Sequence, residues 1–510
     1  MRISTHKHLT WHAVVLGDLG VLVMLALAEL AVHLLTNGQY GFHRDELGFL
    51  DDARFLAWGY VSYPPLTPFV ARVALVLFGP SLVGLRFFAA LGQSVVLVLV
   101  GLMARDLGGS RCAQVVAALA VAIAPIALNW GALFHYGGFD YLWWVLLAFL
   151  AVRLLNTGDP RYWLGLEAVI GLGMLTKYTM AFCVAGLVAG VLLTRARRHL
   201  ASPWMWAGAG LSLLIFLPNL IWQAQHSFIH LQFLSFIHAR DIAIGRTQSF
   251  LLDQLYVPAN PVTVPMWLAG LYFYFFTPSG RPFRLLGWLA VIPWTLLLLA
   301  QGRGYYAGPI YPVLLAGGAV YGGQWLKSLP EARARALWAA TWPTLAAGGL
   351  ITAALVLPIA PINSTWWQLA RMVDPEPKEE IGWPELVQTV AGIYAALPAA
   401  EKPVTAILTN YSEVGAISIY GPAYGLPAAI GGENLDWLRG YGDPAAQTLI
   451  VVGWSRAQVD QFCTNCVLAG RLTNAYRVPN EDSVDRPDIF VCRGLRKPWP
   501  DFWRSIQSFG

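Results

Sequence analysis

Long apolar blocks separated by short polar connectors make up most of the chain before about residue 358. Many blocks contain the roughly 17 to 25 apolar residues that a helix needs to cross about 30 Å of hydrocarbon. We therefore predict about eleven membrane-spanning helices and an all-α polytopic membrane region. The expected ranges are 13–35, 82–104, 112–129, 139–155, 162–175, 178–194, 203–221, 262–277, 285–300, 308–326 and 336–358.

The first of these ranges also has features of a signal peptide, because Arg2 and Lys7 precede the apolar stretch from Val14 to Leu35. That stretch is longer than the hydrophobic region of a signal peptide, and no convincing small-x-small cleavage site accompanies it. We expect it to be retained as the first helix.

The pattern changes near residue 374, after which the sequence is typical of a soluble α/β domain. Short β-rich runs bounded by Gly, Pro and Asn alternate with helical stretches. The strands are expected at 405–408, 448–452 and 488–492, and the helices at 383–397 and 457–462. We predict a membrane domain at 1–360 and a soluble domain at 361–510. The latter contains no phosphate-cradling glycine motif and no recognisable hydrolase triad, so its role is open.

Composition and charge support a membrane protein and give it an orientation. Hydrophobic residues make up 56% and charged residues 12%, against about 25% charged in soluble domains. Lys and Arg gather in alternate connectors, which the positive-inside rule assigns to the cytoplasm. These residues are Arg2, Lys7, Arg105, Arg111, Arg153, Arg161, Arg195, Arg197, Arg198, Arg281, Arg284, Lys327, Arg333 and Arg335. The N-terminus is then cytoplasmic and the C-terminal domain lies outside. The net charge of +5 reflects this anchoring and gives no indication of nucleic-acid binding.

The opposite, outer connectors are the expected place for chemistry. In the first of them, an amphipathic helix containing Leu47, Leu50, Arg54 and Trp58 would lie in the membrane interface. Acidic residues 45 and 46 would stand at its N-terminus, where the helix dipole favours a carboxylate. Such a carboxylate can accept a proton from a hydroxyl or an amine, although acids at a helix start also serve as simple caps.

Several short motifs follow one another through the outer connectors. They are Arg44-Asp45-Glu46, Tyr63-Pro64-Pro65-Leu66, Gly138-Phe139-Asp140, Leu175-Thr176-Lys177-Tyr178, Arg303-Gly304-Tyr305-Tyr306 and Pro309-Ile310-Tyr311-Pro312. The ordered set resembles the GT-C fold polyprenol-phosphate-dependent glycosyltransferases, a family that includes protein O-mannosyltransferases, lipid A aminoarabinose transferases and many bacterial relatives.

The resemblance implies an inverting transfer, in which an acceptor attacks the anomeric carbon of a sugar carried on polyprenyl phosphate. Asp45 matches the catalytic aspartate of the family and would be the general base. Glu46 would support Asp45 or contact the acceptor.

Other candidate residues follow from the charge that develops on the leaving phosphate. Cations stabilise such charge, and Lys177 and Arg303 lie on the side away from the basic connectors, although snorkelling would also explain them. Tyr305 and Tyr306 would contact phosphate or sugar, unless they belong to an aromatic belt. Asp140, His135 and Tyr63 are the remaining substrate-binding candidates, although a lone histidine is more often structural.

One position departs from the family pattern. Relatives usually carry His or Lys where Tyr63 stands, and a tyrosine donates only a neutral hydrogen bond. A phosphate contact from this proline bend is therefore in doubt, and Arg72 or Lys177 would have to compensate.

The long connector 222–261 is expected to close over the substrates. His226 and His230 are spaced i, i+4, as two metal ligands on a helix would be, but no Cys or Glu nearby completes a set. Some relatives hold a metal near this loop. No cofactor is therefore assigned, and a divalent metal stays an open alternative.

Three cysteines lie in the soluble region, which the predicted orientation places in an oxidising compartment. A disulfide is expected there, with Cys466–Cys492 the preferred pair and Cys463 left over. The spacing of Cys463 and Cys466 also fits a redox motif, but the surrounding sequence lacks a thioredoxin context.

Taken together, these features predict a multi-pass glycosyltransferase of a bacterial inner membrane with a periplasmic active site. The acceptor would be a lipid, a glycan or a protein. A flippase or transporter of lipid-linked sugars is the alternative, although repeated halves and broken midplane helices, which typify transporters, are not evident.

Overall fold

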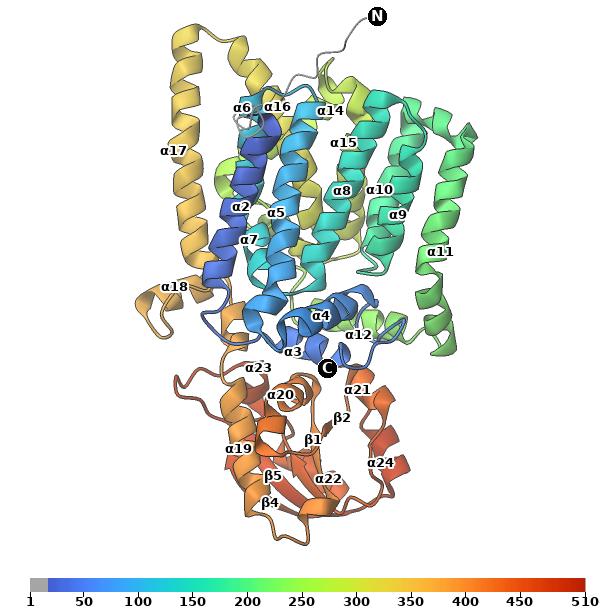
Figure 1. Cartoon of the computed structure of the whole chain (residues 1–510), viewed down its shortest axis with the longest axis vertical. Coiled ribbons are helices and arrows are strands. Elements are labelled where there is room, and N and C mark those ends of the chain that lie inside the picture. The colour runs from blue at the N-terminus through green and yellow to red at the C-terminus, as the bar shows by residue number, and fades with distance from the viewer. Residues whose placement is uncertain (1–16, 510) are drawn as a thin grey trace, which may run out of the picture.

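The computed structural model describes residues 17–509, apart from the side chains of residues 482 and 485. A helical bundle is joined at one end to a small domain built on a β-sheet (Figure 1). This arrangement confirms the predicted fold class, an all-α membrane region with a C-terminal α/β domain. Arg2, Lys7 and the first residues of the range 13–35 lie outside the described residues.

Six helices among the described residues are long and apolar enough to cross a membrane. They are α2 (Asp18–Thr36), α5 (Leu82–Asp106), α8 (Tyr136–Thr157), α11 (Pro203–Gln225), α15 (Arg284–Leu299, extended by the 3-10 turn η3 at Arg281–Phe283) and α17 (Glu331–Val356). Two bent pairs raise the number to eight if each is one span. These pairs are α6 (Arg111–Ala122) with α7 (Pro125–Ala132), and α10 (Met180–Leu193) with η1 (Arg195–Ala201).

The three remaining predicted ranges are helices of fewer than 18 residues in the same bundle. They are α9 (Tyr162–Met174), α14 (Val264–Phe276) and α16 (Tyr311–Lys327). Every predicted range thus coincides with a helix or a bent pair, although fewer of them than predicted have the length of a full span.

Proline explains the break between α6 and α7, whose axes differ by 62°. Ala124 is extended, with ψ of 131°, and Pro125 is the first residue of α7. A residue before proline avoids the helical region, and proline itself suits a helix start because it has no amide hydrogen to bond. The local sequence therefore ends one helix and begins the next.

Glycine allows α14 and α16 to pack against each other at backbone distance. A Cβ on Gly270 of α14 would lie 2.0 Å from the carbonyl oxygen of Leu314, and one on Gly318 of α16 would lie 1.9 Å from that of Met266. No side chain fits at such distances. This is the small-residue packing that membrane helices use to approach closely.

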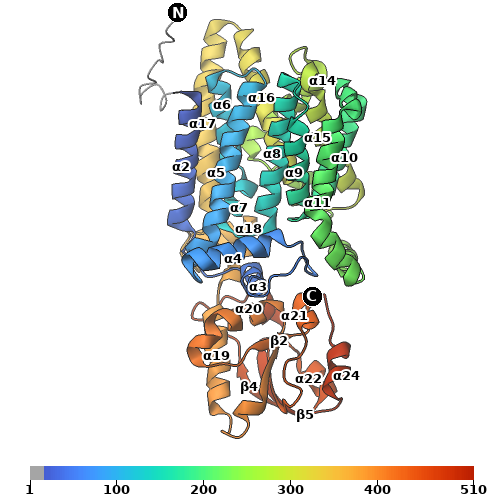
Figure 2. The ribbon, with the colours of Figure 1, turned by 45° about the vertical axis from the view of Figure 1, so that its right-hand side comes forward.

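Short helices lie between the bundle and the sheet domain (Figures 1 and 2). They include α3 (Arg44–Asp52), α4 (Leu66–Phe78), α12 (Ile229–Ala243) and α18 (Thr365–Val373). The expectation for α3 was wrong in two respects. The helix ends before Arg54 and Trp58, and Leu47 and Leu50 are buried instead of facing the membrane interface. Its buried surface packs against helix α20 of the sheet domain (Tyr411–Tyr420).

The C-terminal domain contains a five-stranded sheet in the order β2-β1-β3-β5-β4. Its strands are β1 (Thr405–Thr409), β2 (Ala429–Gly431), β3 (Thr448–Val451), β4 (Cys463–Arg471) and β5 (Asp488–Leu495). β1 pairs in parallel with β2 and β3, whereas β5 is antiparallel to β3 and β4. The predicted strands correspond to β1, β3 and β5, and β2 and β4 were missed.

Helices surround this sheet. They are α19 (Trp383–Ala396), α20, α21 (Asn434–Arg439), α22 (Arg456–Phe462), α23 (Glu481–Asp485) and α24 (Trp499–Ser505). The predicted helices 383–397 and 457–462 correspond to α19 and α22. Helices α20 and α21 lie on the side that faces the bundle (Figure 1), so this side of the domain is able to contact α3.

Candidate active site

The N-terminus of α3 presents Asp45 through a capping box. His43 is the N-cap, and its Nδ1 accepts a hydrogen bond from the backbone N–H of Asp45 (3.1 Å). The Glu46 carboxylate accepts one from the backbone N–H of His43 (2.8 Å). This reciprocal pair fixes the first turn. The Asp45 side chain remains 30% exposed, so it is accessible to a reactant.

Glu46 points in the opposite direction and is completely buried. Arg86 of α5 donates to both of its oxygens, from Nε and Nη2, at 2.8 Å each. The backbone N–H of Phe134 donates a further bond at 2.8 Å. Because Glu46 has no exposed surface, its contact with an acceptor does not fit the structure. Its bonds fit the other predicted role, which is to support Asp45.

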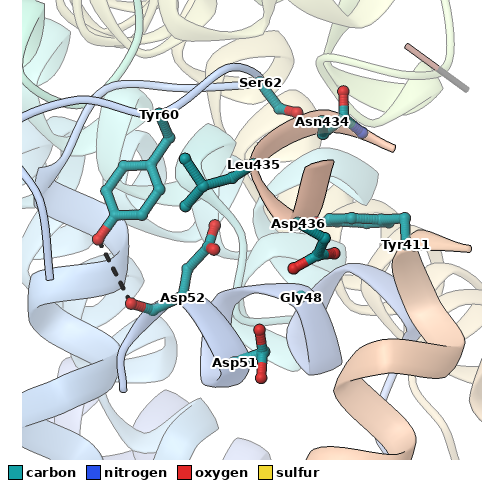
Figure 3. A pocket seen from close by; sticks show the side chains of 9 residues that line it. All are labelled: Gly48, Asp51, Asp52, Tyr60, Ser62, Tyr411, Asn434, Leu435 and Asp436. Atoms are coloured by element: carbon teal, nitrogen blue, oxygen red, sulfur yellow. Dashed lines mark hydrogen bonds between the residues drawn. The ribbon is translucent and has the colours of Figure 1, made fainter. Parts of the chain in front are cut away.

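The C-terminal domain holds the other end of α3. Arg439 of α21 forms ion pairs with Asp51 and Asp52 of α3, and with Asp436 of its own helix. A cavity of about 10 Å³ lies beside this cluster, between α3 and α21 (Figure 3). Burial raises the pKa of Asp52 to about 7, in spite of the opposing charge of Arg439.

Tyr63, predicted to contact substrate, belongs to this buried cluster. Its hydroxyl donates to Asp52 at 2.5 Å, and its ring packs 4.7 Å from that of Phe49. The side chain is buried, which leaves it no surface for a phosphate. The burial of Tyr63 therefore agrees with its departure from the His or Lys of relatives, since neither favours a phosphate contact here.

Lys177 lies between α9 and α10, surrounded by aromatic rings. Its Nζ is 4.3 Å from the ring centre of Tyr306, 5.2 Å from that of Tyr136 and 5.3 Å from that of Tyr305. Within the described part of the chain it has no carboxylate within 4 Å. Burial lowers the pKa of Lys177 to about 8. These contacts hold a cation without neutralising it.

Arg303 lies beside the same tyrosines, at the start of a 3-10 helix, η4 (Gly304–Ile310). Its guanidinium donates from Nε and Nη2 to the two oxygens of Asp241 in α12, at 2.5 and 2.7 Å. The aspartate belongs to the connector 222–261, which was expected to close over the site. Nothing in the local sequence indicated this pairing.

His135 and Tyr136 lie between the base and the cations. His135 caps α8, accepting the N–H of Gly137 at Nδ1 (3.1 Å), and burial lowers its pKa to about 4. The charges of both Asp45 and Lys177 act on this ring. Tyr136 contacts Lys177 and lies within electrostatic range of Asp45. A neutral histidine and a tyrosine thus connect the two halves of the site.

Asp140 lies one turn further along α8 and is buried. Its oxygens accept hydrogen bonds from Trp144 Nε1 (3.1 Å) and Thr179 Oγ1 (2.7 Å). Its charge acts on Lys177. Asp140 is thus held by α8 and Thr179, close enough to Lys177 for the two opposite charges to attract each other.

The structure therefore brings together most of the predicted site residues but not all of them. Asp45, His135, Lys177, Arg303, Tyr305 and Tyr306 gather at one end of the bundle. A further carboxylate reaches the same place from the segment before α19. Glu376 accepts a hydrogen bond from His43 Nε2 at 3.0 Å. Nothing in the local sequence around Glu376 indicated this contact.

The two histidines considered as metal ligands do not share a helix. His226 ends α11, where its Nδ1 bonds the carbonyl oxygen of Trp222 (2.8 Å), whereas His230 lies in α12 with its Nδ1 2.6 Å from the carbonyl oxygen of Val61. The chain between them has positive φ at Ser227 and Phe228. The i, i+4 pairing on one helix was therefore wrong.

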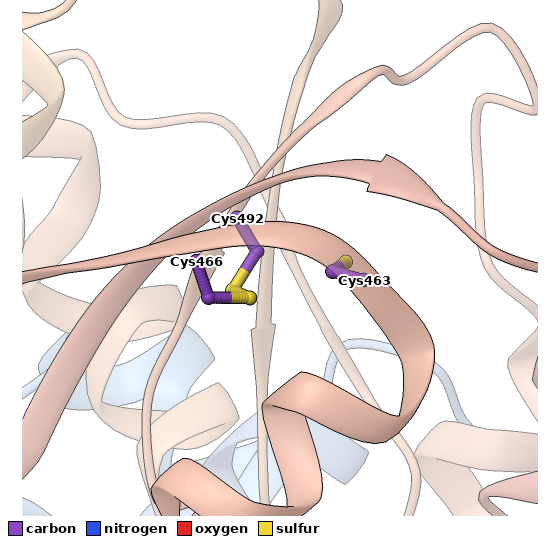
Figure 4. Close-up of side chains that lie close together, drawn as sticks. All are labelled: Cys463, Cys466 and Cys492. Atoms are coloured by element: carbon purple, nitrogen blue, oxygen red, sulfur yellow. A yellow bond between two sulfur atoms is a disulfide. The ribbon is translucent and has the colours of Figure 1, made fainter.

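The preferred disulfide is confirmed, since Cys466 of β4 is bonded to Cys492 of β5. The strand register places these residues directly opposite each other. Cys463 is buried close by, with a free thiol (Figure 4). In the described residues these three are the one group of three His, Cys, Asp or Glu side chains that lies close enough together for a metal site, but the disulfide leaves only Cys463 as a thiol.

Known proteins resemble the chain in sequence and in fold. Residues 62–222 match the family model described as dolichyl-phosphate-mannose-protein mannosyltransferase. The lipid A galacturonosyltransferase RgtD of Rhizobium johnstonii is 26% identical over 292 residues, which cover 52% of this chain and 60% of RgtD.

Two solved structures of ArnT from Cupriavidus metallidurans are similar over almost the whole length. One, bound to undecaprenyl phosphate, has a TM-score of 0.54, and the other, in the apo state, has 0.56. Each is 16% identical, and the match covers 92% of this chain and 97% of ArnT. The chain is therefore a multi-pass membrane protein of the GT-C fold, and its residues 62–222 match the model of the dolichyl-phosphate-mannose-protein mannosyltransferases.

Proposed function

We propose that this protein transfers a sugar from a polyprenyl-phosphate carrier to an acceptor by inverting displacement, with Asp45 as the general base. The proposal is carried by one observation. The accessible carboxylate of Asp45 lies at the same end of the bundle as the two cations and the two neighbouring tyrosines. His135 and Tyr136 connect the two. The similarity to RgtD and ArnT supports the same class of reaction.

In this mechanism, Asp45 takes the proton from the acceptor nucleophile as a bond forms to the anomeric carbon. The bond from that carbon to the phosphate oxygen breaks, and its electrons leave with the phosphate. Lys177 and Arg303 stabilise the negative charge that develops there. The hydroxyls of Tyr305 and Tyr306 are able to donate to phosphate or sugar oxygens.

The reaction is proposed to occur at the periplasmic face of a bacterial inner membrane. The distribution of Lys and Arg supports this orientation, with a cytoplasmic N-terminus and the C-terminal domain outside. A lipid, a glycan or a protein is the proposed acceptor. The membrane domain, proposed as residues 1–360, carries Asp45, Lys177 and Arg303, and the domain at 361–510 supports α3 through Arg439.

Transfer by purified protein in detergent tests the proposal. A panel of polyprenyl-phosphate sugars is supplied with a membrane extract as acceptor, and released polyprenyl phosphate is measured for the natural sequence and for Asp45→Asn. Removing a general base reduces the rate by roughly 10²- to 10⁴-fold. Asp159→Asn changes an exposed acid at the opposite end of the bundle and should act like the natural sequence. Movement of such lipids across vesicles without Asp45-dependent release would favour a flippase.

A further inference from the structure

The bidentate pair between Arg303 and Asp241 joins the candidate phosphate site to helix α12. Asp241 is only 3% exposed, and both of its oxygens are bonded to the one guanidinium. A planar guanidinium binds carboxylate and phosphate through the same two parallel hydrogen bonds. Asp241 therefore occupies the face of Arg303 that a phosphate would use.

The surroundings of this carboxylate are strongly cationic. Arg246 Nη1 is 3.9 Å from Asp241 Oδ1, and the charges of Arg246 and Arg303 both act on Arg240. The Nε of Arg240 is buried and makes no hydrogen bond within the described residues. Asp241 thus lies among three arginines, and the charge of a second carboxylate, Glu481, also acts on Arg240. The phosphate monoester released as product, which carries close to two negative charges, would match these arginines better than the singly charged phosphodiester of the donor.

We propose that Asp241 is an affinity-determining residue of the donor site, whose carboxylate competes with the donor and product phosphate for Arg303. The competition weakens the binding of polyprenyl phosphate and speeds its release after transfer. This inference rests on the proposed function, because it requires Arg303 to bind the phosphate of the lipid carrier.

The placement of Asp241 on α12 also explains how the exchange is accommodated. The start of the helix is held by His230, whose Nδ1 is 2.6 Å from the carbonyl oxygen of Val61. Asp241 lies near its other end, which finishes at Ala243. When phosphate replaces the carboxylate, the last turns of α12 lose the bond to Arg303, whereas the first turn keeps the contact of His230 with Val61.

A binding experiment distinguishes competition from simple support, because the two roles predict changes of opposite sign. The Kd of polyprenyl phosphate is measured with the purified protein for the natural sequence, Asp241→Asn and Arg303→Gln. Loss of a competing charged hydrogen-bonded group should tighten binding about tenfold in Asp241→Asn. Arg303→Gln should weaken it. If Asp241 only positions Arg303, Asp241→Asn will weaken binding as Arg303→Gln does, and the inference is overturned.

Two further variants protect this test from a folding defect. Asp241→Glu keeps the charge and should restore the natural affinity, whereas a charge-independent packing effect would change it in the same direction as Asp241→Asn. The double variant Asp241→Asn/Arg303→Gln should bind like Arg303→Gln alone, because the guanidinium that Asp241 and the phosphate both bind is then absent. An Asp241→Asn protein with Asp45-dependent transfer but unchanged Kd would overturn the inference and leave the proposed function standing.

Discussion

Removing one partner of the buried ion pair between Glu46 and Arg86 should be among the most destabilising single changes to the protein. Both side chains have no exposed surface, and the Glu46 carboxylate accepts four hydrogen bonds, from Arg86 Nε and Nη2 and from the backbone of His43 and Phe134. Glu46→Gln preserves the shape but removes the charge and half of the acceptor capacity. The change leaves a buried guanidinium with less compensation.

The structure sets the expected magnitude. Breaking a buried ion pair by removing one partner costs about 3 to 5 kcal/mol. Arg86 retains Glu380, whose Oε2 is 3.1 Å from its Nη2, and it also donates to the carbonyl oxygens of Asn37 and Gly41. We therefore expect the lower limit, about 3 kcal/mol, and a melting temperature that is lower by several degrees.

Thermal unfolding in detergent measures this effect, with Glu331→Gln as the matched control. Glu331 pairs with Arg335 across one helical turn at 3.7 Å and is 84% exposed, so its loss should change the melting temperature very little. Activity should fall in Glu46→Gln as well, because the capping box that holds Asp45 loses its carboxylate. The reasoning is refuted if Glu46→Gln melts at the same temperature as Glu331→Gln.

Three other changes should have measurable results. Arg439→Ala should make the junction between α3 and the C-terminal domain more sensitive to limited proteolysis, because Asp51 and Asp52 lose their counter-ion. The control variant Arg456→Ala, which changes an exposed arginine, should not have this effect. Equal cleavage of the two variants would contradict the prediction. Burial alone would raise the pKa of Glu376, but the hydrogen bond from His43 lowers this pKa to about 2. The ionised Glu376 therefore contributes its full stabilisation above about pH 4.5. This stabilisation is lost as the pH falls toward 2. The difference in melting temperature between the natural sequence and Glu376→Gln should therefore become smaller as the pH is lowered from 6 to 3. A difference that stays constant over this range would be inconsistent with the lowered pKa of Glu376. Replacing Cys466 and Cys492 by Ser removes a disulfide between residues 26 positions apart. The free energy of unfolding of the domain should fall by about 3 kcal/mol, because the unfolded chain gains loop-closure entropy. An unchanged urea midpoint of the domain would contradict this prediction.

The sequence was sufficient for the membrane helices because hydropathy is a local property. It failed where a local signal has two interpretations. The motif Tyr63-Pro64-Pro65-Leu66 was interpreted only as a proline bend, but Pro65 is also the N-cap of α4, a position where proline costs no hydrogen bond. Strand β4 was missed for a related reason. It is an edge strand with exposed positions such as Thr464, so the buried alternation that identifies a strand is weak.

Local sequence was also insufficient for the candidate site, because its contacts join residues far apart in the chain. Lys177 and Arg303 stand out in sequence because they are cations in connectors on the less basic side. Their partners do not, because Asp241 is 62 residues from Arg303 and Arg439 is 388 residues from Asp51. No periodicity or spacing encodes such pairings. Tertiary structure also decides which of two neighbouring acids is accessible, since Asp45 faces outward whereas Glu46 is buried against Arg86.

The central claim, that Asp45 removes the acceptor proton during sugar transfer, is tested most directly by a single-turnover experiment. Protein in excess over a labelled polyprenyl-phosphate sugar is mixed with the acceptor that supports transfer, and free polyprenyl phosphate and glycosylated acceptor are measured over time. The account predicts that both appear together in the natural protein, and that both are slowed by roughly 10²-fold or more in Asp45→Asn, while the affinity for the donor is retained. Equal rates in the two proteins would contradict it.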